Sequence, residues 1–476
     1  MHSRYIPKWF FCPSLLLILI LILGFSAGCR LGSSGFQTTS SESFVVFTDI
    51  HFTPFYDPEL LDDLVRAEAE DWAAIFSSSS AADLPSWGQE TNYPLLVKTL
   101  DSAGLAVEGD QFILFLGDIL AHEFRKQFFT FFGREDEEAL KSFILKTVSF
   151  FIMQVRERFE TAPVIFVLGN NDSYAGDYSI VAGGSFLDDT AELFYDILLE
   201  GSTDPSGFLA TYEEGGYYAV EPDGSEILFV CLNSIFFSIN RPVGLQDGDD
   251  PGLKELEWLE QTLAKAVADG KRVWLLSHIP PGPDIYWTVS QYMDRKGHIS
   301  DVGMMWKKGY QDRFIKIIEK YQEIINITFC GHTHMEEYRM AQANGNESHL
   351  ITIVNPAVTP LFGNNPAYRV FRMDADDWEL LDYRTEAVDL KNHAPDYETL
   401  YIFSQAYGFM TSLTRALPAL YSELFSDSFK EDDFRRFYYA GHNEASNINN
   451  LNWPAYRCAV GNIDPAGYMS CVNSLD

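Results

Sequence analysis

The stretch Ile325–His334 reads Ile-Asn-Ile-Thr-Phe-Cys-Gly-His-Thr-His, an apolar run of strand length that ends in a glycine and two histidines. Two imidazoles at positions i and i+2 of an extended chain point to the same side, as two ligands of one site would. The chain holds further apolar runs of this length, each followed by polar residues: Phe44–Phe47, Phe112–Leu116, Val164–Leu168 and Val273–Leu276. We predict that all of these runs are strands.

Amphipathic helical segments alternate with these runs: Glu137–Phe159, Thr190–Glu200, Leu253–Ala268 and Asp312–Lys320. This alternation predicts a layered α/β domain. At 476 residues, of which 46% are hydrophobic, the chain can bury the core of one catalytic domain and an appendage. After Thr385 the pattern changes, and we predict two aromatic-rich helices, Tyr397–Leu417 and Leu420–Tyr439, with a break at Pro418.

Polar residues that suit a metal follow each predicted strand: Asp49 and His51, Asp118, Asn170 and Asn171, His278, and His332 with His334. In an open α/β sheet the carboxyl ends of the strands converge on one crevice, so these residues can serve one site. Carboxylate, imidazole and amide ligands suit zinc, iron or manganese better than magnesium or calcium. Two such ions close together form the clamp used for attack on phosphorus.

The concentration of histidine in these motifs favours a functional site over turn chemistry. A single Asp or Gly after a strand often serves only the backbone turn. The chain has ten histidines, of which four lie in the motifs, and His122 follows Asp118 by four residues. A structural origin for all of these motifs is therefore a poor explanation.

The order of the motifs resembles the signature of the calcineurin-like metallophosphoesterase superfamily, DxH, GDxx, GN[HN][DE], H and GHxH. The resemblance implies a layered αββα sandwich that binds two divalent metal ions. Carried over by motif, Asp49, His51 and His334 would hold the first metal, Asn170, His278 and His332 the second, and Asp118 would bridge both.

Further stretches resemble the acid sphingomyelinase-like phosphodiesterases, a group that includes endopolyphosphatases: Gly117–Glu123, Ser277–Gly282 and Asn355–Pro360. The similarity implies a metallophosphoesterase domain over 44–385 and a helical C-terminal subdomain over 386–476. It also implies a small phosphodiester or a phospholipid headgroup as substrate. Acid sphingomyelinase carries a saposin domain ahead of its catalytic domain, whereas here residues 30–43 form only a short linker.

One motif departs from the superfamily pattern. Members usually have a histidine after the motif asparagine, where it donates a proton to the leaving group, but this chain has Asn171. A neutral amide can hydrogen-bond a phosphoryl oxygen but cannot supply a proton. His122 is then the best remaining general acid, because the group also uses a histidine at this position. The Gly-Asn-Asn-Asp variant resembles endopolyphosphatases, which keeps polyphosphate open as a substrate.

Residues 1–29 have the features of an export signal. Arg4 and Lys8 precede the apolar segment Ser14–Leu23, which is too short for a comfortable membrane span. Small residues before Cys29 predict a lipoprotein signal, while plain secretion and an uncleaved anchor stay open. We therefore expect an exported protein, either a periplasmic or cell-surface lipoprotein or a secreted one.

The remaining cysteines divide into two pairs. Cys231 and Cys330 lie in apolar runs, where a free cysteine behaves as a small apolar residue. Cys458 and Cys471 lie close together near the C-terminus, and in an exported chain they suggest one disulfide, although a free pair stays open.

Charge and aromatic content bear on the ligand. A net charge of −34 argues against nonspecific binding of nucleic acid, because Lys and Arg hold phosphate backbones. The aromatic-rich loop Asp284–Trp306 follows His278 and can form a wall of a substrate cleft that attracts a quaternary ammonium group. Simple packing of a long loop is the alternative.

Together these observations predict a phosphodiesterase that uses two divalent metal ions, with zinc expected before iron or manganese. Two enzymatic alternatives stay open, an endopolyphosphatase and a nucleotide phosphomonoesterase. A third alternative is a metal-loaded surface protein that binds phosphorylated ligands without turnover. The sequence leaves the oligomeric state open.

Overall fold

Every predicted strand is present: β1 (Ser41–Phe47), β2 (Ile113–Phe115), β3 (Val164–Phe166), β6 (Arg272–Ser277) and β7 (Ile325–Cys330). The computed structural model describes residues 41–106, 112–160, 162–196, 205–222, 227–342, 349–392 and 395–475. The predicted signal segment, with Cys29, lies outside these residues. The sequence-based prediction of the strands is confirmed.

The described strands form two six-stranded sheets. The first has the order β12-β11-β10-β1-β2-β3 and adds β10 (Ala367–Asp374), β11 (Leu380–Val388) and β12 (Tyr397–Ile402). The second has the order β4-β5-β6-β7-β9-β8 and adds β4 (Tyr218–Val220), β5 (Ile227–Leu232), β8 (Glu337–Gln342) and β9 (His349–Val354). Strands β1, β2 and β3 are parallel to one another, as are β5, β6 and β7.

The two sheets face each other across an aromatic core. Phe44 of β1 lies 5.4 Å from Trp274 of β6, measured between ring centroids, and both rings are fully buried. Phe112, directly before β2, lies 5.0 Å from Phe229 of β5. Aromatic pairs at such distances add specific packing to the burial of apolar area, so this core fixes one sheet against the other.

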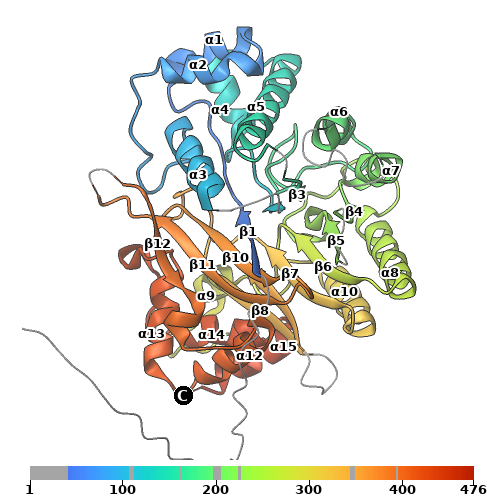
Figure 1. The fold of residues 1–476 in the computed structure, drawn as a ribbon, viewed down its shortest axis with the longest axis vertical. Helices are drawn as coiled ribbons and strands as arrows, with labels where there is room; N and C mark the ends of the chain where they lie inside the picture. The colour runs from blue at the N-terminus through green and yellow to red at the C-terminus, as the bar shows by residue number, and fades with distance from the viewer. Residues whose placement is uncertain are drawn as a thin grey trace, which may run out of the picture. The chain divides into compact units, whose positions relative to one another are not determined.

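Helices cover the outer face of each sheet (Figure 1). Helix α5 (Glu137–Arg158) packs on the first sheet, where Phe151 lies 5.0 Å from Phe115. Helix α8 (Pro251–Asp269) packs on β5 and β6 of the second sheet. The predicted αββα layering is confirmed.

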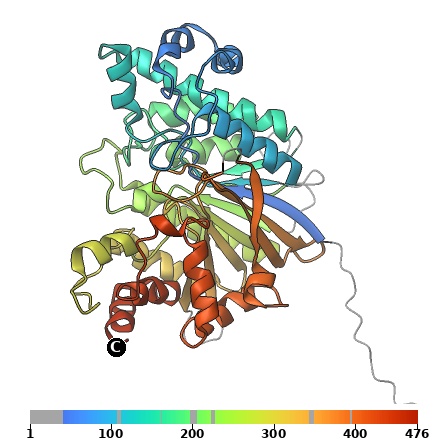
Figure 2. The same cartoon turned by 90° about the vertical axis from the view of Figure 1, so that its left-hand side faces the viewer.

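The other helices have these bounds: α1 (Leu61–Arg66), α2 (Trp72–Ser77), α3 (Tyr93–Ala106), α4 (Phe124–Phe132), α6 (Ser185–Phe194), α7 (Pro205–Gly215), α9 (Ile285–Tyr292), α10 (Lys308–Tyr321), α11 (Phe403–Tyr407), α12 (Leu413–Glu423), α13 (Ser428–Phe437), α14 (Trp453–Gly461) and α15 (Pro465–Asn473). Short 3-10 turns occur at η1 (Pro58–Leu60), η2 (Ala69–Asp71), η4 (Ser234–Phe237) and η5 (Asn443–Ala445). Helices α6 and α10 start five and four residues earlier than predicted. Helices α12 to α15 gather at one end of the described structure (Figures 1 and 2).

The C-terminal region departs from the prediction at two places. The predicted helix Tyr397–Leu417 is wrong over its first residues, because Tyr397–Ile402 is strand β12 and pairs with β11. The first sheet therefore continues past residue 385. Pro418 lies inside α12 and not between two helices. Pro418 has no N–H to donate to the carbonyl of Thr414, so α12 continues past it with one backbone hydrogen bond fewer.

The cysteine predictions hold within the described residues. Cys458 in α14 and Cys471 in α15 form a disulfide, which joins the last two helices. Cys231 and Cys330 are free and buried. None of the helices in the described part of the chain is both long and apolar enough to cross a membrane.

Candidate metal centre

All seven predicted metal ligands come together at the carboxyl ends of the parallel strands. Asp49 and His51 follow β1, Asp118 follows β2, Asn170 follows β3, His278 follows β6, and His332 and His334 follow β7. The first sheet thus supplies four of these residues and the second supplies three. Most of them are buried, and His332 is half-buried.

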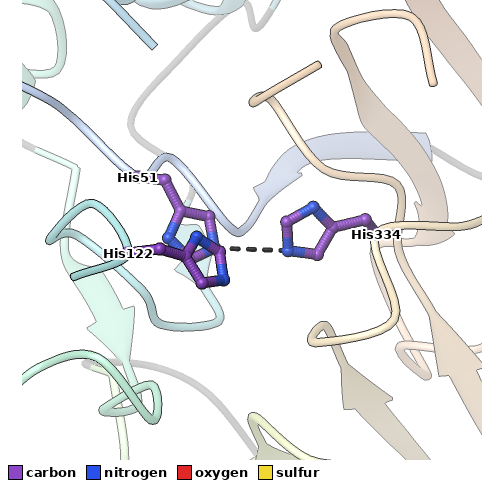
Figure 3. A group of neighbouring side chains, drawn as sticks. All are labelled: His51, His122 and His334. Atoms are coloured by element: carbon purple, nitrogen blue, oxygen red, sulfur yellow. Dashed lines mark hydrogen bonds between the residues drawn. The ribbon is translucent and has the colours of Figure 1, made fainter. Parts of the chain in front are cut away.

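Three of the predicted ligands converge on one point. The Nε2 atoms of His51 and His334 lie 3.2 Å apart, a contact that Figure 3 marks with a dashed line. Asp49 Oδ1 lies 3.3 Å from His334 Nε2 and 3.8 Å from His51 Nε2. These are the residues that the motifs assign to the first metal.

Asp118 lies between this group and a second one. Its Oδ2 atom is 3.3 Å from His51 Nε2 and 3.2 Å from His278 Nε2. His278 Nε2 is also 3.1 Å from Asn170 Oδ1. The His332 ring lies 5.1 Å from the His278 ring, measured between centroids. This is the position that a carboxylate bridging two metals requires.

Hydrogen bonds from outside the site aim the ligand atoms inward. His51 Nδ1 lies 3.0 Å from the carbonyl oxygen of Leu120, and His278 Nδ1 lies 2.7 Å from that of Leu116. A proton on each Nδ1 would donate to these carbonyls and leave a lone pair on Nε2, as metal-binding histidines need. Asn170 Nδ2 donates to Asp177 Oδ1 at 2.7 Å, which turns the amide oxygen of Asn170 toward His278.

The electrostatics of the cluster fit a bound cation. Burial by itself lowers the pKa of His51, but the nearby carboxylates, Asp118 first and then Asp49 and Glu90, together outweigh burial and raise that pKa to about 10. The same opposition raises the pKa of His278 to about 9. Burial raises the pKa of Asp49, but the neighbouring imidazoles, His334 first, hold it well below its usual value. The buried carboxylates therefore favour positive charge at this place, and a divalent cation would supply it.

The backbone is strained at five of the seven ligands. Asp49, His51, Asp118, His332 and His334 all have positive φ angles, between 46° and 73°. Such conformations cost energy in residues with a side chain and persist only where the surroundings enforce them. Their concentration at one place supports a functional site.

Two glycines let the ligand loops approach one another. A Cβ atom at Gly169 would lie 2.1 Å from the backbone nitrogen and from Oδ1 of Asp118. A Cβ atom at Gly331 would lie 2.6 Å from Asp49 Oδ2. The glycine of each motif therefore makes room for a carboxylate from another strand.

Asp172, the last residue of the Gly-Asn-Asn-Asp motif, ties two ligand loops together. Its carboxylate accepts hydrogen bonds from the backbone N–H groups of Asp118, Ile119 and Gly169 at 2.9 to 3.0 Å. Burial, together with the nearby Asp118 charge, raises the pKa of Asp172 to about 7. The sequence reasoning assigned no role to this residue.

Asn171 faces the predicted bridging carboxylate. Its side-chain Nδ2 donates to Asp118 Oδ2 at 3.0 Å, and its backbone N–H donates to Asp118 Oδ1 at 2.8 Å. The residue is buried. A contact between Asn171 and the phosphoryl group stays a prediction.

His122, the predicted general acid, stands beside the first group of ligands. Its ring stacks on that of His51 with 4.1 Å between centroids (Figure 3), and the side chain is 30% exposed. Its ring nitrogen lies close enough to those of His51 and His334 to join a metal site. The structure therefore leaves two roles for His122, proton donor and metal ligand.

Glu90 is a site residue that sequence reasoning missed. Its Oε1 atom accepts from the backbone N–H of His122 at 3.0 Å and lies 2.9 Å from the ring Nδ1 of His122. Burial raises the pKa of Glu90, but the hydrogen bonds from His122 and the nearby His51 together outweigh burial and leave the pKa below its usual value. Glu90 follows no strand, so no motif marked it.

A cavity of about 550 Å³ opens from the cluster toward the C-terminal helices. Its aromatic lining comes from five tyrosines and one phenylalanine: Tyr178, Tyr286, Tyr438, Tyr439, Tyr456 and Phe362. From the aromatic loop, Tyr286 lines the cavity as a cleft wall would, whereas Trp306 is buried and packs on Phe237. One part of the loop therefore forms a wall of the cavity, and another part packs in the interior.

Known proteins resemble this chain over most of its length. The calcineurin-like phosphoesterase family matches residues 43–336. Cyclic GMP-AMP phosphodiesterase SMPDL3A of Rattus norvegicus is 23% identical over 447 residues, which cover 89% of this chain and 90% of the relative. Acid sphingomyelinase-like phosphodiesterase 3b of Homo sapiens is 24% identical over 386 residues, or 76% of this chain and 75% of the relative. Sphingomyelin phosphodiesterase of Bos taurus is 24% identical over 375 residues, which cover 75% of this chain and 54% of the relative.

The family match covers more than half of the chain, and the motif residues inside it converge on one buried cluster. Members of this family use a dinuclear metal centre, and the donors found here suit such a centre. The chain therefore belongs to the calcineurin-like phosphoesterase family and is a hydrolase that acts on phosphoric esters.

Proposed function

We propose that this chain hydrolyses phosphodiesters, as the relatives named for acid sphingomyelinase do, with the seven motif residues as metal ligands. The observation that carries the proposal is the cavity of about 550 Å³ that adjoins Asp118, Asn170, His332 and His334. Small-molecule sites have volumes of about 300 to 1,000 Å³. A phosphodiester has two organic substituents, and a cavity of this size beside the cluster can accept one of them.

The ligand set favours zinc, with iron and manganese as further candidates, because imidazole and carboxylate donors suit these ions. When bound, the two cations supply a water nucleophile at neutral pH and neutralise charge on the phosphoryl oxygens. Asp49 and Asp118 would provide the negative charge that holds the two cations. Asn171 keeps the Asp118 carboxylate in place through its two hydrogen bonds.

His122 serves as the general acid in this proposal. It lines the cavity next to His334, so it can reach an oxygen that departs from a phosphoryl group at the cluster. A positioned general acid contributes about 10² to 10⁴ in rate. The effect is greatest for alkoxide leaving groups, which are poor leaving groups without a proton.

The charge of the cavity favours a substrate whose substituent there is neutral or cationic. Asp177, Asp284 and Glu337 line it, and among the described lining residues Arg339 is the one Lys or Arg side chain. Arg339 is itself paired with Glu337 at 3.0 Å. A polyphosphate chain would place its negative charges against these carboxylates, so a phospholipid headgroup or a nucleoside fits better.

A panel of substrates tests the proposed function. We expect the zinc- or manganese-loaded protein to hydrolyse bis-p-nitrophenyl phosphate at least about tenfold faster, in kcat/KM, than p-nitrophenyl phosphate. Sphingomyelin or a cyclic dinucleotide should be turned over, whereas polyphosphate should not. Faster hydrolysis of the monoester or of polyphosphate would contradict the proposal, and metal-free protein serves as the control.

We also propose that the protein is exported and tethered to a membrane through a lipid on Cys29, which lies outside the described residues. In cells, Cys29→Ser should move the protein from the membrane fraction to the soluble fraction, because a thioether-linked lipid needs the thiol. Cys12→Ser, in the same leader, is the matched control and should leave the protein with the membrane. Membrane association that survives Cys29→Ser would show that an uncleaved anchor holds the protein.

A further inference from the structure

We infer that Glu90 is a positioning residue that orients His122 for proton transfer to the leaving group. The inference rests on the proposed function, in which His122 is the general acid. Glu90 contacts neither the predicted metal ligands nor the cavity through any described bond. Its two bonds to His122 go to the backbone N–H and to the ring, and the bond to the ring is the one that orients the imidazole.

The contacts of Glu90 fix both of its carboxylate oxygens. Oε1 accepts from the backbone N–H of His122 at 3.0 Å and meets the ring Nδ1 at 2.9 Å. Oε2 accepts from the hydroxyl of Thr359 at 3.3 Å. The Glu90 side chain is 12% exposed, so little water competes for these bonds. One carboxylate thus holds His122 by its backbone and its ring together.

The ring of His122 is confined from three directions. Glu90 holds its Nδ1 edge, His51 stacks on one face at 4.1 Å, and Phe362 meets it edge-on at 5.9 Å between centroids. Because Glu90 engages Nδ1, Nε2 is the ring nitrogen that can donate a proton to a substrate in the cavity. As the bond from phosphorus to the leaving oxygen breaks, the Nε2 proton passes to that oxygen. The ring is then neutral and keeps its proton on Nδ1, against Glu90.

The loop that carries Glu90 is itself anchored to the C-terminal part of the chain. We call Ser86–Thr91 the strap. Trp87 of the strap stacks on His442 at 3.8 Å and donates from its indole nitrogen to Asn365 Oδ1 at 3.2 Å. Gly88 donates its backbone N–H to the Pro360 carbonyl at 3.1 Å. These anchors explain why a carboxylate on a loop can set the orientation of a ring.

Glu90→Gln tests the inference, because it keeps the side-chain size and removes the charge. Carboxylates that orient a metal-binding imidazole are typically worth about 10- to 100-fold, and we expect the same range for the imidazole of His122. We expect kcat for sphingomyelin, a phosphodiester with an alkoxide leaving group, to fall by that factor. For bis-p-nitrophenyl phosphate kcat should change less than about threefold, since that leaving group needs no proton. KM and the bound metal should stay as in the parent protein.

Glu123→Gln is the matched control. Glu123 adjoins His122 in sequence, is 63% exposed, and pairs with Lys126 on the surface. The substitution Glu123→Gln removes one negative charge near His122 but leaves the contacts of the imidazole intact. Both substrates should therefore react at the parent rate. In a His122→Ala background, Glu90→Gln should cause no further loss, because the ring through which it acts is gone.

The outcomes separate the inference from the function on which it rests. Equal losses for both leaving groups in Glu90→Gln, or loss of metal, would overturn the inference while leaving His122 as the acid. Equal losses in His122→Ala alone would overturn the acid role itself, and with it the inference. If Glu90→Gln does not fold, Thr359→Val loosens the same carboxylate, and we expect a smaller loss confined to the alkoxide leaving group. Unchanged selectivity in Thr359→Val would then overturn the inference.

Discussion

Asp118→Asn is expected to lower turnover by at least about a thousandfold and to reduce the bound metal below two ions per chain. The Asp118 Oδ2 atom lies 3.3 Å from His51 Nε2 and 3.2 Å from His278 Nε2, so one carboxylate serves both groups of ligands. Asparagine keeps the volume but not the charge. Metal-assisted charge stabilisation is worth several kcal/mol, and about 4 kcal/mol corresponds to the expected factor.

Metal analysis beside the activity assay checks this expectation. Asp284→Asn is a suitable control for metal content, because Asp284 lines the same cavity and caps helix α9 without contacting the ligands. It should retain two ions per chain. Full activity of Asp118→Asn with two bound ions would contradict the bridging role. A fall in activity with both ions retained would place Asp118 in charge stabilisation alone.

His122→Ala is expected to slow hydrolysis of sphingomyelin by about 10² to 10⁴ and to affect bis-p-nitrophenyl phosphate much less. An alkoxide leaving group needs a proton as its bond to phosphorus breaks, whereas p-nitrophenolate leaves without one. The measurement is kcat for both substrates at one pH and at saturating metal. A folding defect would lower kcat for both substrates equally. The ratio of the two losses in kcat therefore measures how much the reaction depends on proton donation by His122.

The metal content of His122→Ala separates the two roles that the geometry allows. The His122 ring stacks on His51 and lies near His334, so it can also offer a nitrogen to a cation. Equal losses for both leaving groups, accompanied by loss of metal, would make His122 a ligand. Equal losses with the metal retained would indicate a role in holding the substrate.

The sequence predicted the strands and the ligands because both follow local rules. Each ligand stands directly after an apolar run, and the parallel arrangement of these runs brings their ends together. Gly169 and Gly331 also mark the site in the sequence, since only glycine leaves room for the opposing carboxylates. The family resemblance then assigned each ligand to the first metal, to the second metal or to both.

Features that depend on long-range contacts were not predictable. Glu90 reaches His122 only because the strap is anchored to Pro360 and His442, far away in the sequence. The side-chain direction of Asn171 follows from Asp118 and not from its own motif. The aromatic residues of Tyr397–Ile402 suit a helix as well as a strand, and the pairing of this segment with β11 decides for the strand.

The division of the ligands between two sheets has a consequence for transplanting the site. Asp49, His51, Asp118 and Asn170 belong to the first sheet, and His278, His332 and His334 to the second. The spacing of the two halves is therefore a property of the aromatic core that Phe44 and Trp274 share. A designer who grafted the loops alone onto another scaffold would inherit the residues but not the distance between them. The smallest portable unit is the pair of facing sheets with the core between them.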